Sequence, residues 1–138
     1  MSERKKQTEA VTSLMRKYRA EKLAFRILSE SKMLTAMGLK SEAIFVWVSK
    51  SWSDYLGWSE EELTSINFFE LIHPDDIKSS ELAFKRFQAT GKIGFKDEYF
   101  TNRYLCKDGS YKRVEWNNIV PTDGDSYMIT ANPIDIDE

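Results

Sequence analysis

Residues 55–76 read YLGWSEEELTSINFFELIHPDD, and this stretch combines two helix starts with a dense cluster of apolar side chains. Ser59 followed three residues later by Glu62 is the pattern of a capping box, in which each side chain satisfies a backbone donor at a helix start. Trp58 and Leu63 flank that cap at the spacing of a hydrophobic staple. The apolar residues that follow are too dense for an exposed loop. The stretch therefore predicts short helices folded onto a core.

The second helix start lies in the HPDD sequence of residues 73–76. Pro74 at a first helical position loses nothing by lacking an N–H, and the acidic residues after it complement the positive end of the helix dipole. The apolar spacing predicts a helix over residues 74–90 that ends at Gly91, a usual residue for a left-handed helix end.

Strand patterns lie on both sides of these helices. Residues 33–48 predict a β-hairpin, since two apolar runs flank a polar turn. Residues 99–106 and 111–120 alternate and are joined by an Asp-Gly turn, which is a strong hairpin signal. A further turn leads into a strand over residues 126–131. We therefore expect an α+β fold, with one antiparallel sheet and the helices gathered on one of its faces.

Residues 3–31 contain no Gly or Pro and predict a long helix. Its apolar residues recur at intervals of three and four, with Glu21 breaking the pattern. Such a helix either packs on its own sheet or pairs with its copy in a dimer, and we expect a homodimer through this helix. Residues 44–48, IFVWV, include no polar residue and predict a strand that is covered on both faces, or central with this helix over its outer side. The candidate dimer residues are Val11, Leu14, Tyr18, Phe25 and Leu28.

Composition sets the broad class. A chain of 138 residues with 41% hydrophobic content predicts one globular domain, here residues 33–138, preceded by the helix of residues 1–32. No apolar run reaches transmembrane length and no signal peptide is recognisable, so we expect a cytoplasmic protein. Cys106 is the single cysteine in the sequence, which leaves no disulfide framework and no zinc cluster.

Charge and motifs argue against nucleic-acid binding and catalysis. Residues 1–32 hold nine Lys and Arg against four Glu, but these residues are scattered around the helix and favour a solvated surface. The sequence has no nucleophile elbow, no phosphate loop and no metal-ligand cluster. We therefore do not expect an enzyme.

Three blocks follow one another along the chain: YLGWSEEEL at residues 55–63, FELIHPDD at residues 69–76 and RYLCKDGSYKRVEW at residues 103–116. Together they resemble the PAS domain family, in the branch with the HPDD word and the Lys-Asp-Gly hairpin that is common in bacterial sensor proteins. The resemblance covers roughly residues 33–136. It implies a five-stranded antiparallel sheet in the order 2-1-5-4-3, cupped around the helices.

The resemblance also implies a role in signalling. Domains similar to this one bind a small ligand in the cup, or bind none and act as dimerising connectors. They pass a signal through flanking helices to a kinase, a cyclase or a transcriptional output. We expect either the N-terminal piece of a larger sensor or a free-standing PAS protein that binds another chain. Ser49 replaces an asparagine frequent in the family and is still expected to cap a helix. Arg113 replaces an aromatic residue.

Aromatic residues and two asparagines suggest a ligand pocket in the cup. Mostly apolar walls with a few polar groups are typical of small-molecule sites, although an ordinary aromatic core has the same composition. The pocket hypothesis predicts a cavity of at least a few hundred cubic ångströms. The candidates are Trp52, Tyr55, Phe69, Phe84, Phe87, Tyr104, Trp116 and Met128, with Asn102 and Asn118 as polar anchors.

Two familiar cofactors do not fit the sequence. Haem needs an axial ligand, and the single histidine, His73, belongs to a helix start. Blue-light flavin domains of this family carry a cysteine in an Asn-Cys-Arg-Phe word on a helix, whereas Cys106 falls in a strand before the Asp-Gly turn. We therefore expect neither haem nor cysteinyl-flavin chemistry, and leave non-covalent flavin or another small ligand open.

Overall fold

The computed structural model describes residues 2–92, 100–122 and 124–135, apart from the side chains of residues 28 and 29. Within them, no helix is both long enough and apolar enough to cross a membrane. In chain order the elements are α1 (Glu3–Glu30), β1 (Leu34–Leu39), β2 (Phe45–Val48), α2 (Lys50–Leu56), α3 (Glu60–Thr64), η1 (Phe68–Leu71), η2 (Pro74–Asp76), α4 (Ile77–Thr90), β3 (Phe100–Leu105), β4 (Tyr111–Pro121) and β5 (Ser126–Pro133).

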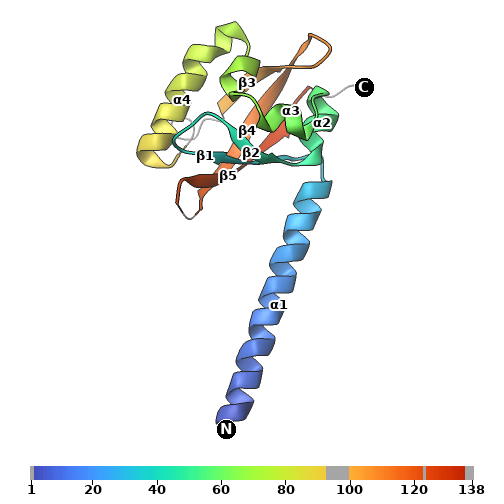
Figure 1. Ribbon diagram of the computed structural model, residues 1–138, viewed down its shortest axis with the longest axis vertical. Coiled ribbons are helices and arrows are strands. Elements are labelled where there is room, and N and C mark those ends of the chain that lie inside the picture. Colours follow the sequence, from blue (N-terminus) through green and yellow to red (C-terminus); the bar gives the residue numbers. More distant parts are fainter. Residues whose placement is uncertain (1, 93–99, 123, 136–138) are drawn as a thin grey trace.

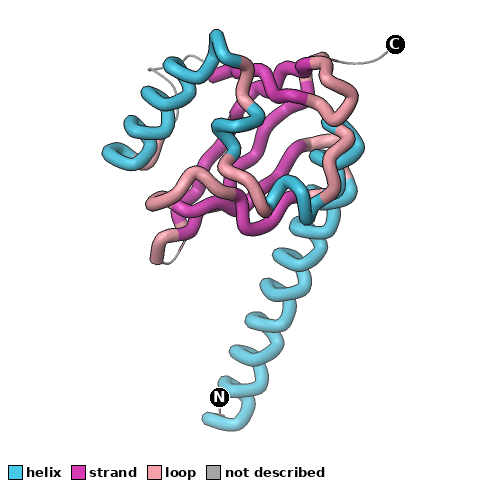
Figure 2. Tube along the Cα trace, turned by 45° about the horizontal axis from the view of Figure 1, so that its top comes forward, coloured by secondary structure: helices cyan, strands magenta, loops and turns pink. Residues whose placement is uncertain are grey.

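The strands form one five-stranded sheet in the order β2-β1-β5-β4-β3, and neighbouring strands are antiparallel. Figure 2 shows them side by side, with short helices packed against the sheet. The core joins buried side chains of α2, α3 and α4 to buried side chains of all five strands, which alternate with less buried residues along β5. The predicted fold and its strand order are confirmed.

The capping box forms as the sequence predicts, whereas the helix predicted over residues 74–90 is an α-helix only from Ile77 onward. Ser59 Oγ accepts a hydrogen bond from the Glu62 backbone at 3.0 Å, and the Glu62 carboxylate accepts one from the Ser59 backbone at 3.1 Å. Pro74–Asp76 form a 3-10 turn that leads directly into α4. The helix ends at Gly91, whose φ of 75° is left-handed.

Ser49 departs from its predicted role. It precedes α2, but its side chain makes no cap. Its Oγ accepts a hydrogen bond from the Thr35 backbone N–H at 3.1 Å and lies 2.7 Å from Ser51 Oγ, which itself donates to the Met33 carbonyl at 2.7 Å. The buried Thr35 N–H needs an acceptor, and the Ser49 hydroxyl supplies it. The two serines therefore fasten the start of α2 to the start of β1.

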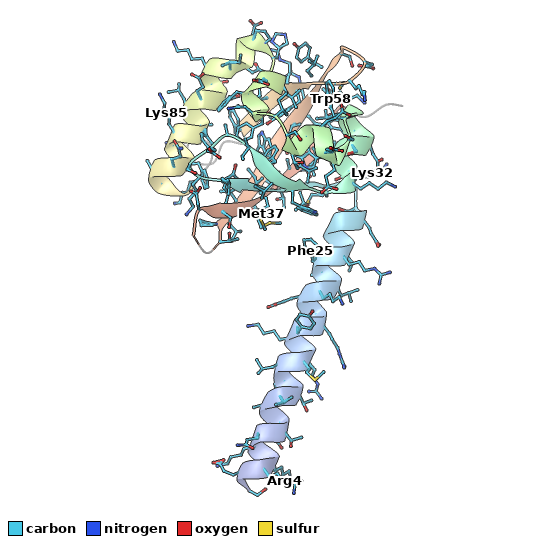
Figure 3. The ribbon with its side chains drawn as sticks, viewed as in Figure 1. Arg4, Phe25, Lys32, Met37, Trp58 and Lys85 are labelled. Carbon is cyan, nitrogen blue, oxygen red and sulfur yellow. The ribbon has the colours of Figure 1, made fainter. Side chains whose placement is uncertain are left out.

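Helix α1 extends away from the domain, with side chains pointing into open space over most of its length (Figures 1 and 3). Near its C-terminal end the ring of Phe25 packs on Trp47 of β2, with centroids 5.4 Å apart. Strand β2 is at the edge of the sheet, and Val46 is 46% exposed. The prediction that residues 44–48 form a strand covered on both faces, or a central one, is therefore wrong. An edge strand has a neighbour on one side, here β1.

Candidate ligand cavity

A cavity of about 50 Å³ lies in the core between the sheet and α4. A space of this size holds roughly three to five water molecules, far less than the few hundred cubic ångströms expected. The aromatic side chains themselves take up the space: ring centroids of Phe45 and Phe68 are 4.8 Å apart, and those of Phe68 and Phe84 are 5.6 Å apart. The size prediction is therefore wrong.

Seven of the ten candidate pocket residues lie at or directly behind the cavity wall. Trp52 is fully buried and stands behind the wall, with its ring 5.7 Å from Trp116 and 5.8 Å from Tyr104. The six that line the cavity are Phe69, Phe84, Phe87, Asn102, Tyr104 and Trp116.

Met128 and Asn118 lie elsewhere. On β5 the side chains of Tyr127 and Ile129 face the core, so Met128 between them faces the opposite side of the sheet. On β4 the pairing register shifts between Trp116 and Asn118, so that Asn118 is exposed. Such a bulge reverses the alternation of side chains along a strand, and simple counting from Trp116 could not anticipate it.

Tyr55 is also outside the cavity. Its hydroxyl donates a hydrogen bond to the Arg113 carbonyl at 2.6 Å and accepts one from the Asp135 backbone at 3.0 Å. The residue therefore ties α2 to β4 and to the chain after β5. It belongs to a separate surface depression that includes Gly57 and Lys107.

A polar relay crosses the otherwise apolar cavity. Asn102 Nδ2 on β3 donates to Ser80 Oγ on α4 at 3.1 Å, and Asn102 Oδ1 accepts from Trp116 Nε1 on β4 at 2.9 Å. All three side chains are buried. The sequence analysis named Asn102 and Trp116 as site candidates but not Ser80. Ser80 could have been recognised because it is a polar residue on the otherwise apolar inner face of a helix.

The described residues that line the cavity are electrically neutral. Burial raises the pKa of the Tyr104 hydroxyl far above its usual value, and a hydrogen bond from Asn102 opposes this only in part. Burial likewise raises the pKa of Tyr127. Both phenols are therefore protonated at physiological pH. Among the described residues, none that lines the cavity carries a charge.

His73 and Cys106 lie outside this cavity. His73 Nδ1 accepts a hydrogen bond from the Asp75 backbone at 3.0 Å, as expected of a helix-start residue, and its ring packs on Tyr111. Cys106 is buried, and that burial raises the pKa of its thiol. The described lining residues thus include no histidine and no cysteine. No group of metal-binding side chains occurs in the described part of the chain.

Trp52 links the cavity wall to the region where α1 enters the domain. Its Nε1 donates to the Thr35 carbonyl at 3.1 Å, and the same carbonyl accepts the Ser49 backbone N–H at 2.8 Å. Ser49 and Ser51 then connect to Met33, a short distance along the chain from the end of α1 at Glu30. Packing and hydrogen bonds therefore run without a break from the cavity to the start of the domain.

The antiparallel sheet with its order β2-β1-β5-β4-β3, cupped around short helices and a small internal cavity, defines a PAS-like α+β domain. The model of the PAS fold family matches residues 45–131. The chain belongs to the PAS fold family. No curated protein sequence matches it.

Solved structures share this fold at low sequence identity. The PAS domain of the Cronobacter turicensis quorum-sensing receptor RpfR, in complex with C12:0, is 12% identical with a TM-score of 0.61, and the match covers 77% of this chain and 97% of that one. The PAS domain of an HTR-like protein from Haloarcula marismortui is 20% identical (TM-score 0.57; 87% and 98% covered). A PAS domain from a two-component sensor histidine kinase is 15% identical (TM-score 0.61; 85% and 98% covered).

Proposed function

We propose that this chain is a non-catalytic sensory domain that binds a small molecule in its cavity and passes the bound state through α1 to a partner protein. The polar relay carries the proposal. Asn102 and Ser80 are buried among aromatic rings, where apolar residues of similar volume would pack without any need for hydrogen bonds. A few polar groups in mostly apolar walls are typical of ligand sites.

Trp52 supports the transmission step. A ligand that displaces Trp116 presses on the Trp52 ring, which is held to the Thr35 carbonyl. Thr35 is on β1, and β1 pairs with β2, whose Trp47 contacts Phe25 of α1. Packed cores transmit small displacements because they are dense.

Two of the similar structures fit a sensory role. One is a quorum-sensing receptor domain in complex with C12:0, and another comes from a sensor histidine kinase. A kinase, cyclase or transcriptional regulator is the class of output partner that we propose for this chain.

The four tryptophans allow a direct test. Trp116 reports on the cavity, Trp52 on the link, and Trp47 on the contact with α1. Trp58, whose Nε1 donates to the Leu105 carbonyl at 2.8 Å, is the internal control. We would titrate the ¹⁵N-labelled full chain with neutral, cationic and anionic fragments and follow the four indole N–H signals by NMR.

We expect fragments that shift the Trp116 signal to shift those of Trp52 and Trp47 as well, while Trp58 stays unchanged. A shift of Trp116 with a silent Trp47 would show binding without transmission to α1. If no fragment shifts the Trp116 signal, the sensing proposal is wrong, and the result favours the second candidate function described below.

A ligand-free dimerisation module is that second candidate. The small cavity favours it, because aromatic rings already fill most of the core. So do two surfaces that carry partly or largely exposed apolar side chains: α1, and an outer-face row of side chains on the far side of the sheet. The outer-face row consists of Trp47, Met37, Met128 and Val120, which are consecutive cross-strand neighbours on β2, β1, β5 and β4.

A further inference from the structure

The orientation of the Asn102 amide is fixed by its partners. The Trp116 indole nitrogen can only donate, so the atom that faces it at 2.9 Å is Asn102 Oδ1. The Asn102 amino group must then face Ser80 Oγ, to which it donates at 3.1 Å.

Ser80 therefore accepts a hydrogen bond and keeps its own hydrogen to donate, and the Tyr104 hydroxyl also carries a hydrogen. A hydroxyl combines one O–H donor with two lone pairs. Within the described residues, neither hydrogen has an acceptor. Both side chains line the cavity, and they are only 5% and 2% exposed, respectively. Buried hydroxyls rarely go without a partner, so two donors are available to whatever occupies the cavity.

The absence of charge among the described lining residues limits which ligands can bind. The nearby Arg103, which follows Asn102 on β3, does not supply a charge, because both Asp76 carboxylate oxygens bind its guanidinium at 2.9 Å. A carboxylate or an ammonium group in the cavity would lose its hydration without meeting an opposite charge, which is strongly unfavourable.

Size sets a limit as well. With room for roughly three to five waters, the cavity of about 50 Å³ accommodates a molecule of about four non-hydrogen atoms without moving its walls. The remaining wall is aromatic and aliphatic, and suits methyl or methylene groups.

We propose that the ligand is a small neutral molecule with one hydrogen-bond acceptor oxygen, such as a ketone or an aldehyde, whose oxygen is bound by the hydroxyls of Ser80 and Tyr104. This assignment rests on the proposed sensory function and specifies the ligand of that same cavity. A carbonyl oxygen has two lone pairs and receives one hydrogen bond from each hydroxyl.

Three molecules of equal size separate the alternatives. Acetone has the acceptor oxygen, isobutene replaces it by an apolar carbon, and acetate adds a negative charge. Each would be titrated into the ¹⁵N-labelled full chain at pH 7 while the Trp116 indole signal is followed by NMR. NMR is suitable because four non-hydrogen atoms give a dissociation constant no tighter than about 0.05 mM. We expect acetone to bind, isobutene to bind at least about fivefold more weakly, and acetate not to bind.

Single-hydroxyl variants test the named donors. Ser80→Ala and Tyr104→Phe each remove one O–H group with little change in side-chain volume. Each substitution should weaken the binding of acetone about fivefold to tenfold and leave the binding of isobutene unchanged. Ser79→Ala is the matched control, since the Ser79 hydroxyl is exposed and donates to the Asp76 carbonyl at 3.0 Å. It should change neither affinity.

The outcomes distinguish the two proposals. If isobutene or acetate shifts Trp116 at least as readily as acetone, or if both hydroxyl variants keep the wild-type acetone affinity, the ligand assignment is wrong and the sensing proposal survives. If none of the three molecules shifts Trp116, the cavity is not a ligand site and both proposals fall.

Discussion

At the scale of single residues, Asp76 has a structural role that the sequence did not reveal. The HPDD motif suggested that both aspartates complement the dipole of the following helix. Instead, Asp76 binds Arg103 on β3: its carboxylate accepts the Arg103 backbone N–H at 2.8 Å and two guanidinium N–H groups at 2.9 Å. These hydrogen bonds hold the pKa of Asp76 below its usual value. The start of α4 is thereby fixed to the strand that carries Asn102.

Asp76→Asn should lower the melting temperature at pH 7 by about 5 °C, because a paired, partly buried carboxylate is lost. A carboxyl whose pKa is depressed in the folded state stabilises fully above its unfolded pKa of about 3.9, and this stabilisation is lost as the pH falls through the folded pKa. Thermal melts from pH 7 to pH 2 should therefore show the difference between wild type and variant shrinking below about pH 4.

The neighbouring Asp75 provides the matched control. Its side chain is largely exposed, and Asp75→Asn should leave the melting temperature nearly unchanged. An equal loss in both variants, or a difference that stays constant down to low pH, would contradict the role given to the Asp76–Arg103 pair.

At the scale of elements, Gly38 determines how β1 packs beneath Tyr127. A Cβ added at Gly38 would lie 2.5 Å from both Cζ and the hydroxyl oxygen of the Tyr127 ring. That ring is buried and lines the cavity, so it has little space to withdraw. Gly38→Ala should therefore cost about 2 kcal/mol of unfolding free energy, measurable by urea denaturation.

A double-mutant cycle checks the cause. Tyr127→Leu removes the ring atoms that a Gly38 side chain would meet, so Gly38→Ala should cost clearly less in that background. If the two substitutions were additive, the loss would come from the backbone of β1 rather than from the clash.

The elements were predictable from sequence to the extent that their signals are local. The capping box at Ser59 and the Asp-Gly hairpin at residues 107–110 involve neighbours in the chain, and both form as expected. The wrong predictions concern contacts between residues that are far apart in the chain. They are the bulge before Asn118, the hydrogen bond between Ser49 and Thr35, and the filling of the cavity by Phe45. Each depends on which elements pack together, and a single sequence does not show this.

At the scale of the whole molecule, the chain presents two apolar surfaces that touch each other only where Phe25 of α1 packs on Trp47, as far as the described ring contacts show. Helix α1 carries exposed apolar side chains along its length, and the outer-face row crosses four strands of the sheet. In Figure 1 the helix projects away from the sheet instead of lying on it. Exposed apolar surfaces of this kind usually mark protein interaction sites. We therefore retain the homodimer through α1 as a prediction.

Leu14 and Tyr18 are the central test of that dimer. They are 67% and 64% exposed and lie on one side of α1 with Val11 and Phe25. Leu14→Glu with Tyr18→Glu should convert dimers to monomers, because charged groups would be buried in the interface. Native mass spectrometry of the full chain gives the assembly mass, and circular dichroism checks that the fold is intact.

Ser13→Glu with Ala20→Glu adds the same charge on the opposite side of the helix and should leave the dimer unchanged. A variant pair at Leu14 and Tyr18 that stays dimeric would place the interface elsewhere, and the outer-face row would be the next surface to alter.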